Sequence, residues 1–522
     1  MTDASSTQDA VGDTPWDLLL SRAERTPSAV MAVDPAGRTI TFEGMRDRAA
    51  ELAGRLAGEG ISAESVVSWQ LPTWIEAMAL TLALSRIGAV QNPLIPMLRH
   101  REVAFITAQA GTDVLVVPQV WRGFDHEAMA RDIAGAGDRL RVLLADADGI
   151  RTSGPSQAPD PWSGAPDDVR WLFYTSGTTA SPKGARHSDE ALLHAARALV
   201  ARVGVRGDDR MGQPAPLTHI GGVILTYVAL LTGCTLLLED AFDPATTPAR
   251  FRDATLIGTG TPFFMAYLAY DEAHPASRPL FPHVRAFLSG GAPKPPSLDG
   301  QLRAALGAGI VSGYGMTECP MLAWNAPEDD PALLATTEGR PVDGVTVQVL
   351  APDSTPVAPG VEGELCVLGP QLLKGYVDPA LDADALTPGG FLRTGDLVRV
   401  DGDGNITVTG RVKDVIIRNM ENISSKEVED LLITHPAVRD VAVIGLPAPG
   451  IGERVCAVVV PEGAAPDLES LAAHLREQGM SSRKFPEQLE IVDVLPRNAM
   501  GKLEKVALRR RYENPATSAA VR

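Results

Sequence analysis

The stretch that most constrains this chain is Tyr174–Gly184, whose sequence is YTSGTTASPKG. Glycine, serine and threonine dominate it, and it ends in Pro182-Lys183-Gly184. A strand-like apolar run, Trp171–Tyr174, leads into it, and a helix-like run, Ala191–Leu199, follows. Small hydroxylated residues at such a junction offer hydrogen-bond donors to a polyphosphate, and a lysine adds a point charge. The spacing is not that of a Walker A loop, and the residues favour phosphate binding over a flexible surface loop.

Length and charge limit the partners. With 522 residues the chain is too long for one core, so it should contain two or more domains. The net charge of −18 argues against nucleic acid or an anionic membrane as partner, and it suits a cytoplasmic protein. The four cysteines are widely spaced and form no Cys-x-x-Cys pair, so neither a disulfide framework nor a zinc site is supported.

Two segments bear on targeting and membranes. Residues 1–14 are polar, without the basic and apolar regions of a signal peptide, and are expected to be disordered. The uncharged run Gly221–Leu238 approaches the length of a membrane span. Threonines interrupt it and Gly233-Cys234 has the character of a turn. We therefore expect a buried helix followed by a buried strand, and no membrane span.

The order of apolar runs predicts the fold class. Short runs that are apolar on both faces, such as Val114–Pro118, alternate with helical patterns such as Ile75–Ile87. This alternation is typical of an α/β protein with parallel sheets covered by helices. From about Thr337 onward β-branched runs and turns predominate. We predict a large domain over residues 15–412, with a β-rich subdomain over about 337–412, and a small α+β domain over 413–522.

Further motifs follow the first stretch where strands or turns end, the edge at which open α/β sheets bind ligands. They are Gly313–Glu318 (GYGMTE), Thr394–Asp396 (TGD), Gly410–Asp414 (GRVKD) and Gly501-Lys502. With this ordered set the chain resembles the adenylate-forming superfamily of acyl-CoA synthetases, peptide-synthetase adenylation domains and luciferases. The resemblance runs from about residue 16 to about residue 510. Within the superfamily it is most similar to acyl-CoA ligases for alicyclic and short- or medium-chain acids.

The resemblance implies ATP as a substrate, Mg²⁺ as cofactor and CoA as co-substrate. ATP converts a carboxylate to an acyl-AMP, and catalysis is mainly positioning and electrostatics because charge accumulates on the phosphates. Glu318 would hold Mg²⁺, Thr317 would bond the α-phosphate, Tyr314 would stack on adenine and Asp396 would accept the ribose hydroxyls. The group implied to hold the departing pyrophosphate is Thr175, Ser176, Gly177, Thr178, Thr179 and Lys183. The remaining nucleotide-binding residues implied are Gly291, Ala292, Pro293, Gly315, Met316 and Arg411.

Two lysines near the C-terminus have separate implied roles. Lys502 would bridge the substrate carboxylate and the α-phosphate. Lys413 would be the hinge about which the small domain rotates, which makes that domain mobile. An isolated lysine in a loop is ordinarily a solvated charge, but the flanking Pro496 and Gly501 favour the functional interpretation for Lys502.

The acid and its acceptor are less constrained. By resemblance the acyl pocket is lined by His219, Gly222, Ser289, Gly290 and Gly313, and His219 is equally compatible with a half-buried structural histidine. No charged residue stands out there, so an apolar acid is favoured.

The acceptor tunnel departs from the family pattern. Met420 occupies a position that is usually glycine, where the pantetheine arm of CoA approaches the backbone. A flexible methionine can pack aside or block the arm.

Three functions remain open at this point. The leading one is acyl-AMP formation followed by transfer to CoA. The second passes the activated group to a carrier-protein thiol or an amine, or activates nitrite and gives a diazo product. The third is a nucleotide-binding protein without turnover, against which Lys183, Glu318, Asp396 and Lys502 argue. The sequence leaves open whether the chain forms a homodimer.

Overall fold

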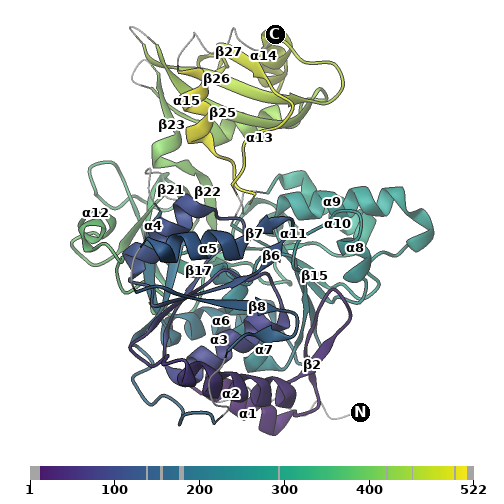
Figure 1. Ribbon diagram of the computed structural model, residues 1–522. Coiled ribbons are helices and arrows are strands. Elements are labelled where there is room, and N and C mark those ends of the chain that lie inside the picture. The colour runs from purple at the N-terminus through teal and green to yellow at the C-terminus, as the bar shows by residue number, and fades with distance from the viewer. Residues whose placement is uncertain are drawn as a thin grey trace. The chain divides into compact units, whose positions relative to one another are not determined.

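The computed structural model describes residues 12–136, 139–152, 157–175, 182–291, 294–418, 421–448, 451–498 and 501–513 (Figure 1). The chain divides into two units: Met1–Thr346 with Val367–Leu392, and Val347–Cys366 with Arg393–Arg522. This division follows compactness and groups most of the β-rich strands with the C-terminal part, whereas residues 337–412 were assigned to the large domain from sequence. The domain boundaries and the rotation hinge at Lys413 stay predictions.

One sheet of the first unit carries the phosphate stretch at its edge. Its strands run in the order β11-β10-β4-β3-β5-β8-β9. The inner pairs are parallel, while β11 and β9 pair antiparallel with their neighbours. All five residues of β5 are buried, as expected for a strand covered on both faces. The bounds are β3 Val66–Trp69, β4 Val90–Pro93, β5 Val114–Pro118, β8 Arg141–Asp146, β9 Gly149–Ile150, β10 Val169–Thr175 and β11 Lys183–Ser188.

The other large sheet of this unit supplies the strand ends expected at the nucleotide and the acid. Its order is β18-β17-β16-β15-β14-β12-β13-β1-β2, parallel from β16 to β1 and antiparallel at both edges. The bounds are β1 Val30–Val33, β2 Thr39–Thr41, β12 Arg210–Gln213, β13 Thr235–Leu238, β14 Leu256–Thr259, β15 Ala286–Gly290, β16 Ile310–Met316, β17 Cys319–Trp324 and β18 Arg340–Pro341. A short hairpin of β6 Val120–Trp121 and β7 Phe124–Asp125 lies apart from both sheets.

Helices cover both sheets because each sheet is apolar on both faces. A central core joins the inner faces of the two sheets through α1, α2, α3, α6 and α7 (Figure 1). A second core packs α9 and α10 on the outer face of the β14–β16 strands, and a third packs α4 and α5 on β5. The bounds are α1 Pro15–Arg25, α2 Phe42–Gly58, α3 Ile75–Ile87, α4 His100–Ala110, α5 His126–Gly135, α6 Asp189–Val203, α7 Ile220–Thr232, α8 Thr247–Arg250, α9 Thr261–Ala273, α10 Pro296–Leu306, α11 Pro331–Thr336 and α12 Asp382–Ala385, with short 3₁₀ turns at Pro275–Ser277 and Pro379–Leu381.

The long uncharged run resolves into the two elements expected of it. Helix α7 ends at Thr232, and Gly233 caps it in the left-handed conformation with φ +83°. Strand β13 follows from Thr235 and is buried in the sheet. Among the described helices, none has both the length and the hydrophobicity needed to cross a bilayer.

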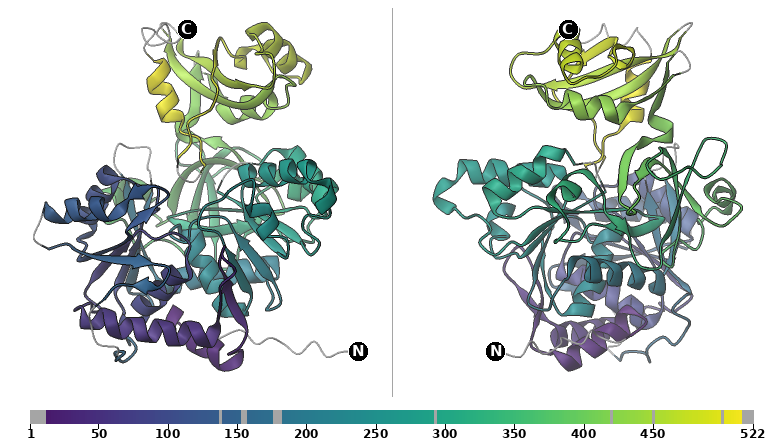
Figure 2. Two further views of the ribbon diagram at one scale, coloured as in Figure 1. Left: turned by 45° about the vertical axis from the view of Figure 1, so that its right-hand side comes forward. Right: turned by 180° about the vertical axis from the view of Figure 1, so that it is seen from behind.

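The described residues of the second unit form two sheets. The first has the order β19-β20-β21-β22, and the second joins β24-β23-β26-β25 with β27 alongside β26. The strands of the second sheet are coloured yellow-green in Figure 2. Two cores lie on opposite faces of the β25–β26 ribbon, one under α13 and α14 and one under α15. The bounds are β19 Thr346–Leu350, β20 Gly363–Leu368, β21 Leu392–Val400, β22 Ile406–Arg411, β23 Val415–Arg418, β24 Glu421–Ser424, α13 Ser425–Leu432, β25 Val438–Ala448, β26 Gly452–Pro461, α14 Leu468–Glu477, β27 Gln488–Ile491 and α15 Lys505–Tyr512, with 3₁₀ turns at Val412–Asp414 and Ser482–Lys484.

Candidate active site

The described ends of the phosphate stretch lie on the two arms of a hairpin. Strands β10 and β11 pair antiparallel, with Thr175 opposite Lys183. The helical run expected at Ala191–Leu199 is part of α6, which begins at Asp189, and β11 lies between the stretch and that helix. Strand β11 was not expected from the sequence, because it is short, carries charged residues and has no alternating burial pattern. Of the predicted phosphate ligands, Thr175 and Lys183 are placed at the two ends of the hairpin arms; Ser176, Gly177, Thr178 and Thr179 lie outside the described residues.

The GYGMTE motif forms a second hairpin. Met316 pairs with Cys319 across β16 and β17, so Thr317 and Glu318 make its two-residue turn. A Cβ at Gly315 would lie 2.6 Å from the backbone nitrogen of Met321, and one at Gly313 would overlap the Trp324 ring. Glycine is therefore required at both positions by close packing of the two strands. The carboxylate of Glu318 is consequently fixed at a turn and is largely buried, with the residue 8% exposed.

A segment that the sequence analysis overlooked joins the two hairpins. We call Leu373–Val377 the strap. Its Lys374 nitrogen donates to the Arg186 carbonyl of β11 at 2.7 Å, and Arg186 donates back to the Gly375 carbonyl at 3.0 Å. The nitrogen of Leu373 donates to the Glu318 carbonyl at 2.8 Å. The strap thus binds the backbone of the phosphate hairpin on one side and that of the Glu318 turn on the other.

Tyr376 of the strap brings two predicted site residues together. Its hydroxyl donates to Oε1 of Glu318 at 2.9 Å. The Nζ atom of Lys183 lies 5.8 Å from the centroid of its ring, within the range of a cation–π contact. Burial and the Glu318 carboxylate raise the pKa of Tyr376, so the hydroxyl stays protonated and remains a donor. We call Lys183, Glu318 and Tyr376 the phosphate corner.

A buried histidine supports the same turn from β11. His187 donates from Nε2 to the Thr317 carbonyl at 2.8 Å. Burial lowers the pKa of His187 to about 4, so the ring is neutral at physiological pH. The carbonyls of both turn residues, Thr317 and Glu318, are therefore held by neighbouring segments.

The strand ends expected at the acyl pocket and the adenine slot lie side by side. Ser289 and Gly290 of β15 pair with Ser312 and Gly313 of β16. Tyr314 and Met316 are half-buried on β16, and Gly291 follows β15 with φ +78° in the left-handed region. Ala292 and Pro293 lie outside the described residues.

Two of the residues expected at the acid, His219 and Gly222, lie at the start of α7. His219 caps this helix, and its Nδ1 accepts from the Gly221 nitrogen at 3.2 Å. A Cβ at Gly222 would lie 2.4 Å from the Pro216 carbonyl oxygen, so this glycine lets the first turn pack on the preceding loop. At the end of β14, Cβ atoms at Gly258 and Gly260 would each meet only one carbonyl oxygen within 4 Å.

The predicted ribose acid belongs to the second unit. Asp396 on β21 is 3% exposed and pairs with Arg411 on β22, Nε to Oδ1 2.7 Å. The Asp396 nitrogen donates to Thr394 Oγ1 at 3.1 Å, so two residues of the TGD motif fix each other. Lys413 lies in the 3₁₀ turn just after β22, where burial and Arg411 lower its pKa.

The predicted catalytic lysine lies in a turn of the second unit. The Lys502 nitrogen donates to Asn498 Oδ1 at 3.0 Å, and the Asn498 nitrogen donates to the Lys502 carbonyl at 2.8 Å. Gly501 has φ +75°, which favours glycine there. These contacts hold the backbone, while the Lys502 side chain is exposed. Met420 lies outside the described residues.

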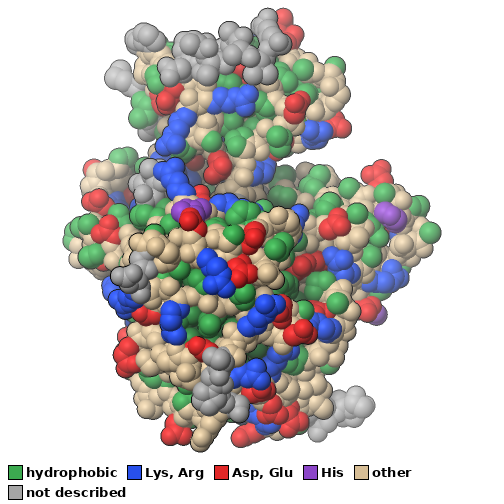
Figure 3. Space-filling model, in the orientation of Figure 1, with side chains coloured by type: hydrophobic (Ala, Val, Ile, Leu, Met, Phe, Trp, Pro, Cys, Tyr) green, Lys and Arg blue, Asp and Glu red, His purple; other side chains and the backbone are tan. Residues whose placement is uncertain are grey.

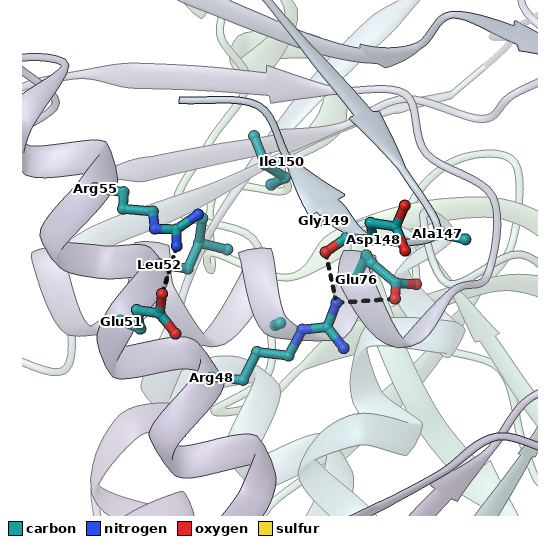
Figure 4. Close-up of a pocket in the computed structure, with 10 residues that line it drawn as sticks. Arg48, Glu51, Leu52, Arg55, Glu76, Ala147, Asp148, Gly149 and Ile150 are labelled. Atoms are coloured by element: carbon teal, nitrogen blue, oxygen red, sulfur yellow. Dashed lines mark hydrogen bonds and ion pairs between the residues drawn. The ribbon is translucent and has the colours of Figure 1, made fainter. Parts of the chain in front are cut away.

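A cavity elsewhere in the first unit carries none of this chemistry. It encloses about 450 Å³ between α2, α3 and the β8–β9 hairpin (Figure 4). Arg48 points across it to Glu76, Nη2 to Oε1 3.0 Å, and Arg38 binds the same carboxylate oxygen at 3.1 Å. None of its described lining residues was predicted for the site. The cavity is therefore a polar gap bridged by ion pairs.

Charged side chains and possible metal ligands elsewhere in the described residues give no second candidate site. On the face drawn in Figure 3, basic and acidic side chains are interspersed among the described residues. The four cysteines are buried as free thiols. Within the described part of the chain, no three His, Cys, Asp or Glu side chains are grouped to hold a metal ion. A cation that arrives on a nucleotide needs fewer protein ligands, since phosphate oxygens and water complete its shell.

Comparison with known proteins decides the family. Residues 19–377 match the model of the AMP-binding enzyme family, and residues 427–502 match that of its C-terminal domain. The chain belongs to the AMP-binding enzyme family. This confirms both the predicted membership of the adenylate-forming superfamily and the predicted class of enzyme, a ligase of the acyl-CoA synthetase type.

Relatives match this family member over most of its length. It is 31% identical over 518 residues to the medium-chain fatty-acid–CoA ligase of Escherichia coli, covering 94% of this chain and 88% of that one. It is 32% identical over 518 residues to the salicyl-AMP ligase/salicyl-S-ArCP synthetase of Mycobacterium tuberculosis, covering 94% and 89%. The crystal structure of ATP-bound MatB from Rhodopseudomonas palustris superposes with a TM-score of 0.88 at 28% identity, covering 97% of this chain and 99% of that one. The predicted α/β fold with its C-terminal α+β domain is thereby confirmed.

Proposed function

We propose that this enzyme activates a carboxylic acid with ATP and transfers the acyl group to CoA. In the first step a carboxylate oxygen attacks the α-phosphorus of ATP; the bond to the bridging oxygen breaks and pyrophosphate leaves. In the second step the thiol sulfur attacks the acyl carbon; a C–S bond forms, AMP leaves with the C–O bond electrons and the thiol proton is lost to solvent. The observation that carries the proposal is the phosphate corner, where a lysine and a carboxylate are held on either side of one tyrosine in an AMP-binding family member.

The residues divide the first step between them. Lys183 and the phosphate hairpin would hold the departing pyrophosphate, which needs positive charge and donors. Asp396 would accept the ribose hydroxyls, with Arg411 fixing its carboxylate at 2.7 Å. Lys502 would neutralise charge between the acid and the α-phosphate as they approach.

Magnesium fits the corner through Glu318. A hard divalent cation bound to ATP takes one or two carboxylates besides phosphate oxygens and water. Tyr376 occupies Oε1 of Glu318, and a carboxylate has lone pairs on its second oxygen to offer a cation. The bound ion would neutralise phosphate charge and orient the leaving group.

The acid is proposed to be uncharged beyond its carboxylate. The strand ends of β15 and β16 expected at the acid present glycines and serine, and His219 accepts a hydrogen bond that caps α7. A charged acyl group would lose hydration there without an opposite charge as compensation. A cytoplasmic location is proposed as well, since ATP and CoA are both required and the cysteines are free thiols.

A different acceptor is the second candidate. The relative from Mycobacterium tuberculosis is named for a carrier-protein product, and the chain has Met420 in the acceptor segment. The deciding experiment incubates the enzyme with ATP, Mg²⁺ and a panel of acids, with and without CoA, and identifies the products by mass spectrometry. Acid-dependent pyrophosphate with an acyl-CoA product supports the proposal. An adenylate that gives no thioester supports the second candidate, and no pyrophosphate from any acid contradicts adenylation itself.

A further inference from the structure

The carboxylate predicted to hold magnesium is itself held by a tyrosine. Tyr376 is 6% exposed, and its hydroxyl donates to Glu318 Oε1 at 2.9 Å. A hydrogen bond to a charged acceptor is stronger than a neutral one, and burial of both partners reduces competition from water. Glu318 therefore has a fixed direction before any ligand arrives.

The backbone around Tyr376 is fixed as closely as its side chain. Its nitrogen donates to Asp382 Oδ1 at 2.8 Å, and the next residue, Val377, donates to the Gly184 carbonyl at 2.8 Å. Gly375 has φ +86°, and a Cβ there would lie 2.8 Å from Asp382 Oδ2. Both the backbone conformation and the space available at this position therefore favour glycine immediately before the tyrosine.

The same side chain faces the phosphate lysine. Lys183 Nζ is 5.8 Å from the centre of the Tyr376 ring, and Ala185 forms an antiparallel bridge with Tyr376. The attraction between an ammonium and the ring face reduces the freedom of a long flexible side chain. One residue thus orients both a cation ligand through its hydroxyl and a phosphate ligand through its ring.

We propose that Tyr376 is a positioning residue that couples the magnesium carboxylate to the phosphate lysine. The strap Leu373–Val377 sets the separation of Glu318 and Lys183, so that both meet one Mg²⁺–ATP complex without rearranging. This inference rests on the proposed function, because it assumes that the nucleotide carries Mg²⁺ to Glu318. The two contacts are separable, since the hydroxyl serves the metal side and the ring serves the phosphate side.

The test measures ATP binding to the whole protein by calorimetry, without any acid, once with excess Mg²⁺ and once with EDTA. Tyr376→Phe removes only the hydroxyl, so it should weaken binding of Mg²⁺–ATP by roughly ten-fold, the low end for one hydrogen bond to a charged group. Binding of metal-free ATP should be unchanged. Tyr376→Leu also removes the ring and should weaken metal-free ATP binding by roughly two- to five-fold.

A matched control separates positioning from general loss of packing. Tyr227→Phe removes a buried tyrosine hydroxyl of the same unit that donates to a different carboxylate, that of Asp189, at 2.7 Å. It should leave the ratio of Mg²⁺–ATP to metal-free ATP affinity as in wild type. Thermal melting of all variants checks that each is folded.

The contradicting outcomes are specific. If Tyr376→Phe weakened the binding of Mg²⁺–ATP and of metal-free ATP equally, the tyrosine would have only a packing role. If it weakened neither, Glu318 would be oriented without the tyrosine. If the ATP affinity of the wild-type protein did not depend on Mg²⁺, the assumed role of Glu318 as a metal ligand would be wrong. Failure of the proposed function is distinguishable, because it concerns acid-dependent pyrophosphate release and this assay contains no acid.

Discussion

The phosphate corner and the turn that carries Lys502 differ in how closely their functional side chains are held. In the corner, Glu318 and Tyr376 are each less than a tenth exposed, and two hairpins and the strap fix them. In the turn, Asn498 and Gly501 fix the backbone, yet the lysine side chain is exposed. Preorganised groups suit charge that is present throughout the reaction, namely the phosphates. A side chain projecting from a turn suits a group needed in one step only.

The substitution expected to have the largest effect, and therefore the strongest test of this difference, is Lys502→Ala. If Lys502 serves adenylation only, acid-dependent pyrophosphate exchange should fall roughly 10³-fold or more, as for other cations that stabilise a transferring phosphoryl group. Conversion of a synthetic acyl-AMP to product should persist. Lys484→Ala is a matched control, because Lys484 is a lysine of the same unit that pairs with Glu427 at 2.7 Å. Equal loss in both half-reactions would end the assignment of separate steps.

The corner itself is tested by Glu318→Gln. This change keeps the shape and the acceptor oxygen for Tyr376 but removes the charge, so the Mg²⁺ concentration for half-maximal pyrophosphate release should rise roughly 100-fold. Steady-state rates over a Mg²⁺ titration measure it. A variant with the wild-type Mg²⁺ profile would show that the cation is held elsewhere.

The ion pair of Arg411 and Asp396 in the second unit, of which only the aspartate is buried, offers an intermediate case. Asp396→Ala should raise the KM for ATP roughly 10- to 100-fold, because two charge-assisted hydrogen bonds to ribose are lost. The change also leaves Arg411 without this carboxylate, so Asp396→Asn helps to separate ribose binding from stability. Asp401→Ala is the control in the β21–β22 turn, where Asp401 accepts from the Asn405 nitrogen at 2.8 Å. An unchanged KM in Asp396→Ala would show that the ribose contact is misassigned.

The smallest effect is expected at Met420. If methionine narrows the path of the pantetheine arm, Met420→Gly should lower the KM for CoA by roughly three-fold, less than 1 kcal/mol. The adenylation rate should not change. Thioester formation that appears only in Met420→Gly would instead show that wild type passes its adenylate to another acceptor.

The order of the motifs could be predicted from the sequence, whereas the local geometry around them could not. Gly313 and Gly315 marked a site, but the reason for each glycine is a neighbour on β17 that no local pattern reveals. The helical periodicity of Ala191–Leu199 predicted a helix there, whereas β11 is a six-residue edge strand that no periodicity marked.

Tyr376 shows why part of the site could not be predicted. It lies 58 residues after Glu318 and 193 after Lys183 in the chain, within an ordinary-looking run, Leu372–Val377. Only the pairing of the strap with β11 brings it to both residues. A glycine next to an aromatic residue was the available signal, and alone it indicates a turn.

The sequence by itself determined the family chemistry, because phosphate, ribose and metal each require particular residue types that survive as short motifs in fixed order. It also determined the α/β class, because burial on two faces leaves continuous apolar runs. Tertiary structure alone decided which of those residues meet, since a hydrogen bond such as that from Tyr376 to Glu318 depends on distances of a few ångströms between segments far apart in the chain. The strap sets those distances through backbone hydrogen bonds. Almost every residue type can form such bonds, so the amino-acid sequence does not show where they will be made.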